Sequence, residues 1–263
     1  MRRYSTSSSG FQFDWDWSIT PAIKFLVLAC AAVYLVQLLV RQFGGPLVEY
    51  RDIELFFGLV PYGVTHALRI WQPFTYLFLH DPSTIWHILL NVFFLWMFGR
   101  DVERAWGQKR FYIYYFICGA GAGVINVTVK TILDPHGLGS ALIPTIGASG
   151  AIYGVLLAAA ILFPHQRVLL FPFPVAISMR VFVGVMGVIE FFGTLGAGGD
   201  KVSHVCHLGG MLVGYLYLRR GSYLYSYRNR VSDWKRRRML RKFEVYQKRH
   251  RDEPPPPPDN WVN

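Results

Sequence analysis

The chain has 263 residues, of which 52% are hydrophobic and only 16% are charged, and its mean hydropathy is +0.28. Charged residues make up about a quarter of an ordinary soluble domain. The composition therefore excludes an ordinary soluble globular protein and favours an integral membrane protein.

Six apolar runs have roughly the length that an α-helix needs to cross about 30 Å of hydrocarbon. The first run lacks a small-residue cleavage site and is long enough to span, so it predicts a retained helix rather than a signal peptide. A patchy amphipathic connection follows it through about residue 82. The expected fold class is an all-α integral membrane bundle of six transmembrane helices. Their approximate ranges are 21–41, 84–99, 111–130, 147–163, 175–195 and 202–218.

Lys and Arg in short loops favour the cytoplasmic side of a membrane. The N-terminus, the 100–110 loop and the 164–174 loop carry such residues, whereas the 131–146 loop has none. Both termini are therefore expected to be cytoplasmic. The expected domains are a cytoplasmic segment 1–20, a membrane domain 21–220 and a basic, proline-ended cytoplasmic tail 221–263.

The formal net charge of +11 comes mostly from residues 219–251, which include the stretch KRRRMLRK. Because this stretch directly follows the last apolar run, its expected partner is anionic inner-leaflet lipid rather than nucleic acid. The run Pro254–Pro258 then predicts a stiff polyproline extension.

Polar side chains in three of the predicted helices lie near their outer ends. A serine beside a histidine pairs a nucleophile with a general base, and backbone N–H groups at a helix N-terminus stabilise a developing oxyanion. Ser149 lies within the first turn of the fourth helix, and His204 and His207 lie near the start of the sixth. The two histidines are three residues apart on roughly one face, so periodicity leaves open which of them is the base. His87 and Asn91 share a face of the second helix and are expected to donate to the same oxygen.

Glycines at four-residue spacing allow two helix backbones to approach closely. Gly150 and Gly154 have this spacing in the fourth helix, as Gly210 and Gly214 have in the sixth. These pairs explain how a short serine side chain could reach an imidazole.

Other chemically capable residues have simpler interpretations. Cys206 adjoins His207 but points about 100° away on a helix, so it is expected to pack. The cysteines show no disulfide framework and no metal-ligand spacing, and no metal or cofactor is expected. Glu190 is a carboxylate in the apolar fifth run. It is expected to have a polar partner or access to cavity water, with gating of substrate entry as the alternative, and it is left outside the site.

Four motifs together resemble the rhomboid family of intramembrane serine proteases, and the likeness covers about residues 20–220. They are GASGAIYG at 147–154, HLGGMLVG at 207–214, HILLN at 87–91 and GRDVERAWG at 99–107. The resemblance implies a six-helix bundle with a Ser–His dyad that needs no third acid, in a water-filled cavity open to the outside. It departs from the family pattern at Trp71–Gln72, where a Trp–Arg pair is frequent.

The resemblance also implies roles for individual residues. Ser149 matches the nucleophile, and His207 matches the general base. His87 and Asn91, with the Ser149 backbone, match the oxyanion-stabilising groups. Tyr153 matches the aromatic residue that packs on the catalytic imidazole, and the supporting glycines are Gly147, Gly150, Gly210 and Gly214.

The expected function is an intramembrane serine endopeptidase that cleaves membrane-spanning protein substrates near the outer face of the bilayer. The expected location is the bacterial inner (plasma) membrane, with the chain as a multi-pass protein. One alternative is a catalytically silent rhomboid-like module that binds membrane proteins, but both nucleophile and base are present. A small-solute transporter is the other, but the chain lacks internal repeats with paired broken helices.

Overall fold

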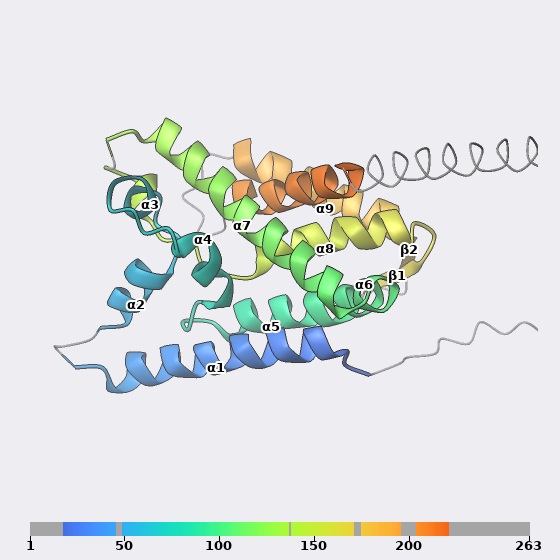
Figure 1. Ribbon diagram of the computed structural model, residues 1–263, viewed down its shortest axis with the longest axis horizontal. Coiled ribbons are helices and arrows are strands. Elements are labelled where there is room, and N and C mark those ends of the chain that lie inside the picture. Colours follow the sequence, from blue (N-terminus) through green and yellow to red (C-terminus); the bar gives the residue numbers. More distant parts are fainter. Residues whose placement is uncertain (1–17, 46–48, 137, 171–174, 196–203, 221–263) are drawn as a thin grey trace, which may run out of the picture. The chain divides into compact units, whose positions relative to one another are not determined.

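The computed structural model describes residues 18–45, 49–136, 138–170, 175–195 and 204–220, and this part of the chain is mostly helical (Figure 1). The expected segment 1–20 lies outside it except for its last three residues, and so does the whole tail 221–263. The helices and strands are α1 (Pro21–Phe43), α2 (Tyr50–Phe57), α3 (Pro61–His66), α4 (Gln72–Thr75), the 3-10 helix η1 (Tyr76–Phe78), α5 (Ile85–Phe94), the π-helix η2 (Leu95–Gly99), α6 (Arg100–Trp106), α7 (Gln108–Leu133), the 3-10 helix η3 (Ser140–Leu142), α8 (Ser149–Leu162), β1 (Arg167–Leu170), β2 (Val175–Ser178) and α9 (Met179–Leu195). Residues 204–220 form a further helix.

Three helical segments of the described chain are long and apolar enough to cross a membrane, by length and composition. They are Pro21–Phe43, Ile85–Trp106 and Gln108–Leu133. The helix α8 is apolar but has only 14 residues, and α9 has 17. The count of six crossings therefore stays a prediction, as does the orientation of the termini.

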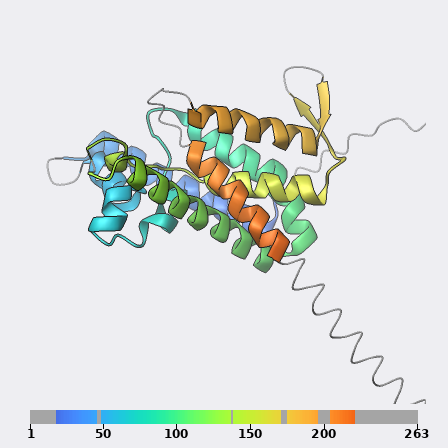
Figure 2. The ribbon, with the colours of Figure 1, turned by 90° about the horizontal axis from the view of Figure 1, so that it is seen from above.

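The helix α8 lies between α7 and residues 204–215 of the last described helix (Figure 2). Ten of its 14 residues are buried. A helix that is apolar all round is typical of a buried position. Its short length fits this place, because Thr145, Gly147 and Ala148, just before the helix begins, are already buried.

The second apolar run continues farther than expected. Instead of ending near residue 99, the helical path passes through the π-helix η2 into α6 and ends at Trp106, before Gly107, whose φ is +79°. A positive φ is the backbone conformation that glycine adopts without strain. The charged residues Arg100, Asp101, Glu103 and Arg104, expected in a loop, therefore belong to the last turns of this helix.

The fifth apolar run is not helical from its start. Val175–Ser178 forms β2, which pairs antiparallel with Arg167–Leu170 of β1, and α9 begins only at Met179. A short apolar run does not distinguish a strand from a helix by periodicity alone. The expectation of an all-α protein is therefore wrong at this hairpin, where the backbone of Met179 also donates to Gln166 O (2.8 Å).

Glu103 of α6 holds the start of α1. Its carboxylate accepts hydrogen bonds from the backbone N–H groups of Ala22 (2.9 Å) and Ile23 (3.2 Å) and from the hydroxyl of Thr20. The first N–H groups of a helix have no partner within the helix, and the helix dipole favours a negative charge there. We call this end of the bundle, with the start of α1 and with α6, the α6 end.

The connections at the other ends of these helices pack on one another. Leu59, which precedes α3, forms a two-way backbone bridge with Thr145 (2.9 Å each), and the Gly147 N–H donates to Tyr76 O (2.9 Å). Farther along, the His80 N–H donates to the side chain of Gln37 in α1 (3.0 Å). We call this end the η1 end, and α8 begins on its side.

Candidate active site

Ser149 is the first residue of α8, and the segment before it is tightly held. Asn126 and Lys130 of α7 both donate to the Thr145 hydroxyl oxygen (3.0 Å each). Gly147 has a φ of +121°, and a Cβ built on it would lie 2.8 Å from His87 Nε2. A larger residue at position 147 would therefore be strained and would also meet the His87 ring.

The structure brings Ser149 and His207 together. The serine Oγ lies 2.7 Å from His207 Nε2, within the range of a hydrogen bond from a hydroxyl to an imidazole. Tyr153, one helical turn after the serine, stacks on the His207 ring with centroids 4.4 Å apart and planes 10° apart. The histidine is 8% exposed, so its ring is held in one orientation between the serine and the tyrosine.

Glycine makes this contact possible. A Cβ on Gly210 would lie 1.8 Å from the backbone oxygen of Gly150, so the helix 204–220 touches the backbone of α8 at this point. A Cβ on Gly150 would lie 3.0 Å from Cys206 Sγ, while Gly154 and Gly214 both face Cys118 of α7. Small residues thus bring α8 close to its neighbours, as helices in membranes require.

His87 faces the same space from α5. Its Nδ1 atom accepts a hydrogen bond from the Asp81 N–H (3.1 Å), so the ring proton of the neutral imidazole is assigned to Nε2. That Nε2 atom faces Gly147, and a Cβ built on Gly147 would lie 2.8 Å from it and 3.9 Å from Ser149 Oγ. Asn91, by contrast, donates through Nδ2 to the His87 carbonyl (2.7 Å), so one of its two N–H groups is already used within the helix.

Glu190, which was expected to lie outside the site, has its partners in the residues around His207. It is 5% exposed in α9, and Tyr153 donates its hydroxyl to Oε1. His204 Nδ1 lies 2.6 Å from Oε2, and His207 Nδ1 lies 2.9 Å from the same oxygen, at ion-pair distance but without the alignment of a hydrogen bond. The available signal was a single carboxylate in an apolar helix. Its partners, 14 to 37 residues away, were not visible in the sequence.

The cluster of Glu190, His204 and His207 has the donor types of a metal site. Their nearest ligand atoms all lie within 4.8 Å of one another. The 2.6 and 2.9 Å separations are too short for neighbouring ligands of zinc, which lies about 2.0–2.2 Å from each N or O ligand and holds its ligands about 3 Å or more apart. The arrangement therefore fits a carboxylate that receives N–H groups better than it fits a cage around an ion.

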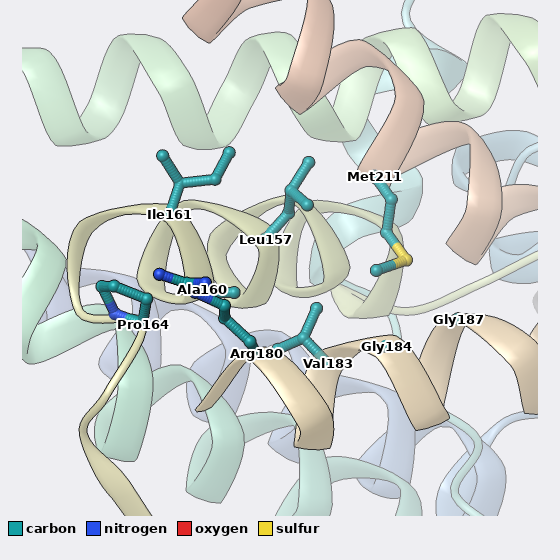
Figure 3. Close-up of a pocket in the computed structure, with 9 residues that line it drawn as sticks. All are labelled: Leu157, Ala160, Ile161, Pro164, Arg180, Val183, Gly184, Gly187 and Met211. Atoms are coloured by element: carbon teal, nitrogen blue, oxygen red, sulfur yellow. The ribbon is translucent and has the colours of Figure 1, made fainter. Parts of the chain in front are cut away.

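A cavity of about 500 Å³ lies away from the serine, between α8, α9 and Met211 (Figure 3). Leu157, Ile161 and Val183 supply apolar walls, and Arg180 of the first turn of α9 lies at one end of it. None of its lining residues belongs to the Ser149–His207 contact. This cavity is therefore a separate surface feature and not the place of the chemistry.

Comparison with known proteins supports the resemblance drawn from the motifs. The family model described as "Rhomboid domain" matches residues 67–223. The chain is 30% identical over 138 residues to "Rhomboid protein 1, mitochondrial" of Saccharomyces cerevisiae, which covers 50% of this chain and 37% of that protein. It is 27% identical over 145 residues to "Presenilin-associated rhomboid-like protein, mitochondrial" of Rattus norvegicus (52% and 35%), and 25% identical over 169 residues to "RHOMBOID-like protein 1" of Arabidopsis thaliana (62% and 38%). The chain thus matches little more than a third of the length of these relatives.

These relatives contradict the expected location in a bacterial inner membrane. The yeast and rat proteins are named as mitochondrial, and both organisms are eukaryotes. The error has a physical origin, because apolar runs and loop charges indicate that a chain spans a membrane but do not distinguish one energy-transducing membrane from another.

Proposed function

The chain belongs to the rhomboid family, and on that premise we propose that it is an intramembrane serine endopeptidase that cleaves membrane-spanning proteins. Ser149 is the nucleophile and His207 the general base. The single observation that carries the proposal is the 2.7 Å contact between Ser149 Oγ and His207 Nε2. A hydroxyl in hydrogen-bond contact with a buried imidazole is the arrangement that activates a serine.

The proposed reaction follows from these positions. His207 Nε2 takes the Ser149 proton as Oγ attacks the scissile carbonyl, and the resulting oxyanion develops beside the first turn of α8. In this reaction the N–H groups of that turn, which have no partner within the helix, and the Nε2–H of His87 donate to the oxyanion. The imidazolium then gives its proton to the leaving amine, and water hydrolyses the acyl-enzyme after the same base has taken its proton.

The proposed substrate is a single-span protein whose helix opens near the η1 end. A helix hides its carbonyls in its own hydrogen bonds, so the segment must unwind before Ser149 can attack. Gly and Pro have the lowest helix propensities, so such residues near the end of the substrate span favour cleavage. The similarity to mitochondrial relatives makes a mitochondrial membrane the proposed location.

Purified protein in liposomes with a fluorogenic single-span reporter tests the proposal. Ser149→Ala and His207→Ala are expected to stop cleavage and to stop labelling by a serine-reactive fluorophosphonate. Ser178→Ala, a serine in β2, is the matched control and should cleave as the parent does. Cleavage by a folded Ser149→Ala protein would overturn the protease proposal.

The proposal also places the η1 end on the side opposite the basic loops. Ala105 in α6 and His136 after α7 are both exposed and lie beyond opposite ends of the Gln108–Leu133 span, while Cys30, Cys118 and Cys206 are buried. Single substitutions Ala105→Cys and His136→Cys should therefore react with an impermeant thiol reagent from opposite sides of sealed vesicles. Labelling of both from one side would overturn this orientation.

A further inference from the structure

Glu190 contacts residues at or next to the proposed active site. Both oxygens of this buried carboxylate have partners, the Tyr153 hydroxyl at Oε1 and the two histidine Nδ1 atoms at Oε2. A carboxylate within an apolar bundle is unfavourable unless it is paired, so its presence needs a reason. Tyr153 and His207 also form the stacked pair beside Ser149. The contacts therefore tie Glu190 to the nucleophile and base rather than to a distant structural element.

We propose that Glu190 is a positioning residue that orients His207 through its Nδ1 atom, so that Ser149, His207 and Glu190 work as a triad rather than as the dyad implied by the resemblance. This inference rests on the proposed protease function. It concerns the same site and adds the group that holds the base in its reactive form.

The reactive form of His207 requires a proton on Nδ1. His207 Nε2 must be unprotonated to receive the Ser149 proton, so the neutral ring carries its hydrogen on the other nitrogen. That nitrogen is buried, and Glu190 Oε2, at 2.9 Å, is the acceptor within reach among the described residues. Catalytic contacts are often poorly aligned without substrate and tighten during the reaction. A small rotation of the carboxylate would align this one.

The carboxylate is itself held in place from two sides. The Tyr153 hydroxyl fixes Oε1, and His204 Nδ1 holds Oε2. Gly193, one turn after Glu190 in α9, makes room for this second ring, because a Cβ there would lie 2.6 Å from His204 atoms. His204 is thus a further support of the carboxylate, and it does not contact Ser149 in the structure.

The chemical consequence is largest when His207 becomes positively charged. The imidazolium forms next to an anion that is already in place and already desolvated, so no reorganisation is needed at that moment. The same logic applies to the acid of other Ser–His–acid sites, which fixes the tautomer and stabilises the cation without taking the proton. Loss of the charge with retention of shape should therefore reduce turnover and leave substrate binding unchanged.

Glu190→Gln tests this directly, because Gln has nearly the same shape. Its kcat in liposomes is expected to fall at least about 100-fold, with KM within about twofold and with an unchanged melting temperature in detergent. A purely structural role would instead lower the melting temperature and leave kcat per folded molecule unchanged. A folded Glu190→Gln protein with a kcat within threefold of the parent would overturn the inference, while Ser149→Ala would still report on the proposed function.

Tyr153→Phe is the second variant, for the case that Glu190→Gln does not fold. It keeps the ring on His207 and removes only the hydroxyl at Oε1. Its kcat is expected to fall about three- to tenfold with KM unchanged, because the carboxylate loses one of its supports. An unchanged kcat would then overturn the inference.

A zinc measurement tests the alternative that Glu190, His204 and His207 bind a metal ion. The active protein, purified without added metal, is expected to contain less than about 0.1 zinc per chain, the level of a trace contaminant. Its rate is expected to stay the same in excess EDTA. One zinc per chain, lost in Glu190→Gln, would identify a metal site and overturn the positioning role.

Discussion

Glu103 and Glu190 are both buried carboxylates, exposed by 3% and 5%, yet their partners are of different kinds. Glu103 receives two backbone N–H groups at the start of α1, together with a threonine hydroxyl. Within the described part of the chain, the partners of Glu190 are all side chains, a tyrosine and two histidines. Backbone partners give Glu103 a structural role, because they fix the start of a helix. The histidine and tyrosine partners of Glu190 instead belong to the proposed active site. A buried charge is therefore interpreted better from its partners than from its burial.

The largest effect is expected from replacing one of the two histidines that contact Glu190, which tests whether the partners of this carboxylate take part in the reaction. His207→Ala should lower turnover by at least about 10³-fold, as loss of the base does in other serine proteases. His204→Ala removes a support of the carboxylate but leaves the Ser149 contact, so its turnover should fall less than about tenfold. Both rates are measured with the liposome reporter on folded protein. The reverse order would show that His204 is the base.

The next largest effect is expected where helices touch through glycine. Gly210→Ala would place a methyl group 1.8 Å from the Gly150 oxygen, so α8 and the helix 204–220 must separate and the Ser149–His207 contact lengthens. A misplacement of about 1 Å costs about 10²-fold in rate.

Gly99→Ala is the matched control near the α6 end. There the nearest atom is the flexible tip of Ile23, at 2.7 Å, which can move aside. Its turnover per folded molecule should stay within twofold of the parent. Equal losses in kcat for the two variants would contradict the assignment of the catalytic contact to the α8 interface.

Glu103→Gln tests the structural half of the comparison. Gln keeps one acceptor at the start of α1 but loses the charge, at a cost of about 2 kcal/mol for a buried charged acceptor. The melting temperature should fall by about 4–8 °C, and the kcat of the folded fraction should not change. A large loss of kcat without a loss of stability would remove the distinction between the two carboxylates.

The smallest effect is expected from acid, at a buried histidine near the η1 end. Burial and the neighbouring His87 lower the pKa of His80 from 6.5 to about 3. The unfolded chain therefore binds a proton below pH 6.5 that the fold does not accept, so stability is lost as pH falls from that value toward 3. Between pH 7 and 6 the loss is about 0.7 kcal/mol.

Thermal unfolding in detergent at both pH values measures this loss. His80→Gln should show a smaller pH effect, and His66→Gln, at an exposed position, should behave like the parent. An unchanged pH effect in the His80 variant would show that another group binds the proton.

Local spacing was sufficient to predict the contact between α8 and the helix 204–220. The four-residue repeats of Gly150 and Gly210 mark surfaces that approach closely, and the motifs around Ser149 and His207 then identify the residues at that surface. Helical periodicity was enough to place the glycines and the polar residues on shared helix faces. The choice of His207 over His204 came from the family motif and not from spacing.

The role of Glu190 was not accessible in this way. Its direction depends on where α9 begins, and that is determined by the β1–β2 hairpin and by the Met179–Gln166 backbone bond. A shift of one residue would turn the carboxylate by about 100° around the helix axis. Periodicity shows that a helix has a polar position, but it does not show which neighbour that position faces. The extension of the second helix through η2 was missed for a different reason, because the charged residues after residue 99 suggested a loop.

The attachment of Thr145 to Asn126 and Lys130 has a consequence for where a substrate is cut. These two donors connect the entry to α8 with fixed positions along α7, so the height of Ser149 within the bundle is a built-in length. In the proposed protease, the depth of a substrate bond in the membrane therefore decides first whether Ser149 can reach it. The sequence around the bond matters only after that. Because a helix rises about 1.5 Å per residue, moving a substrate's susceptible bond by two residues would carry it about 3 Å past the nucleophile, which is about the length of a hydrogen bond.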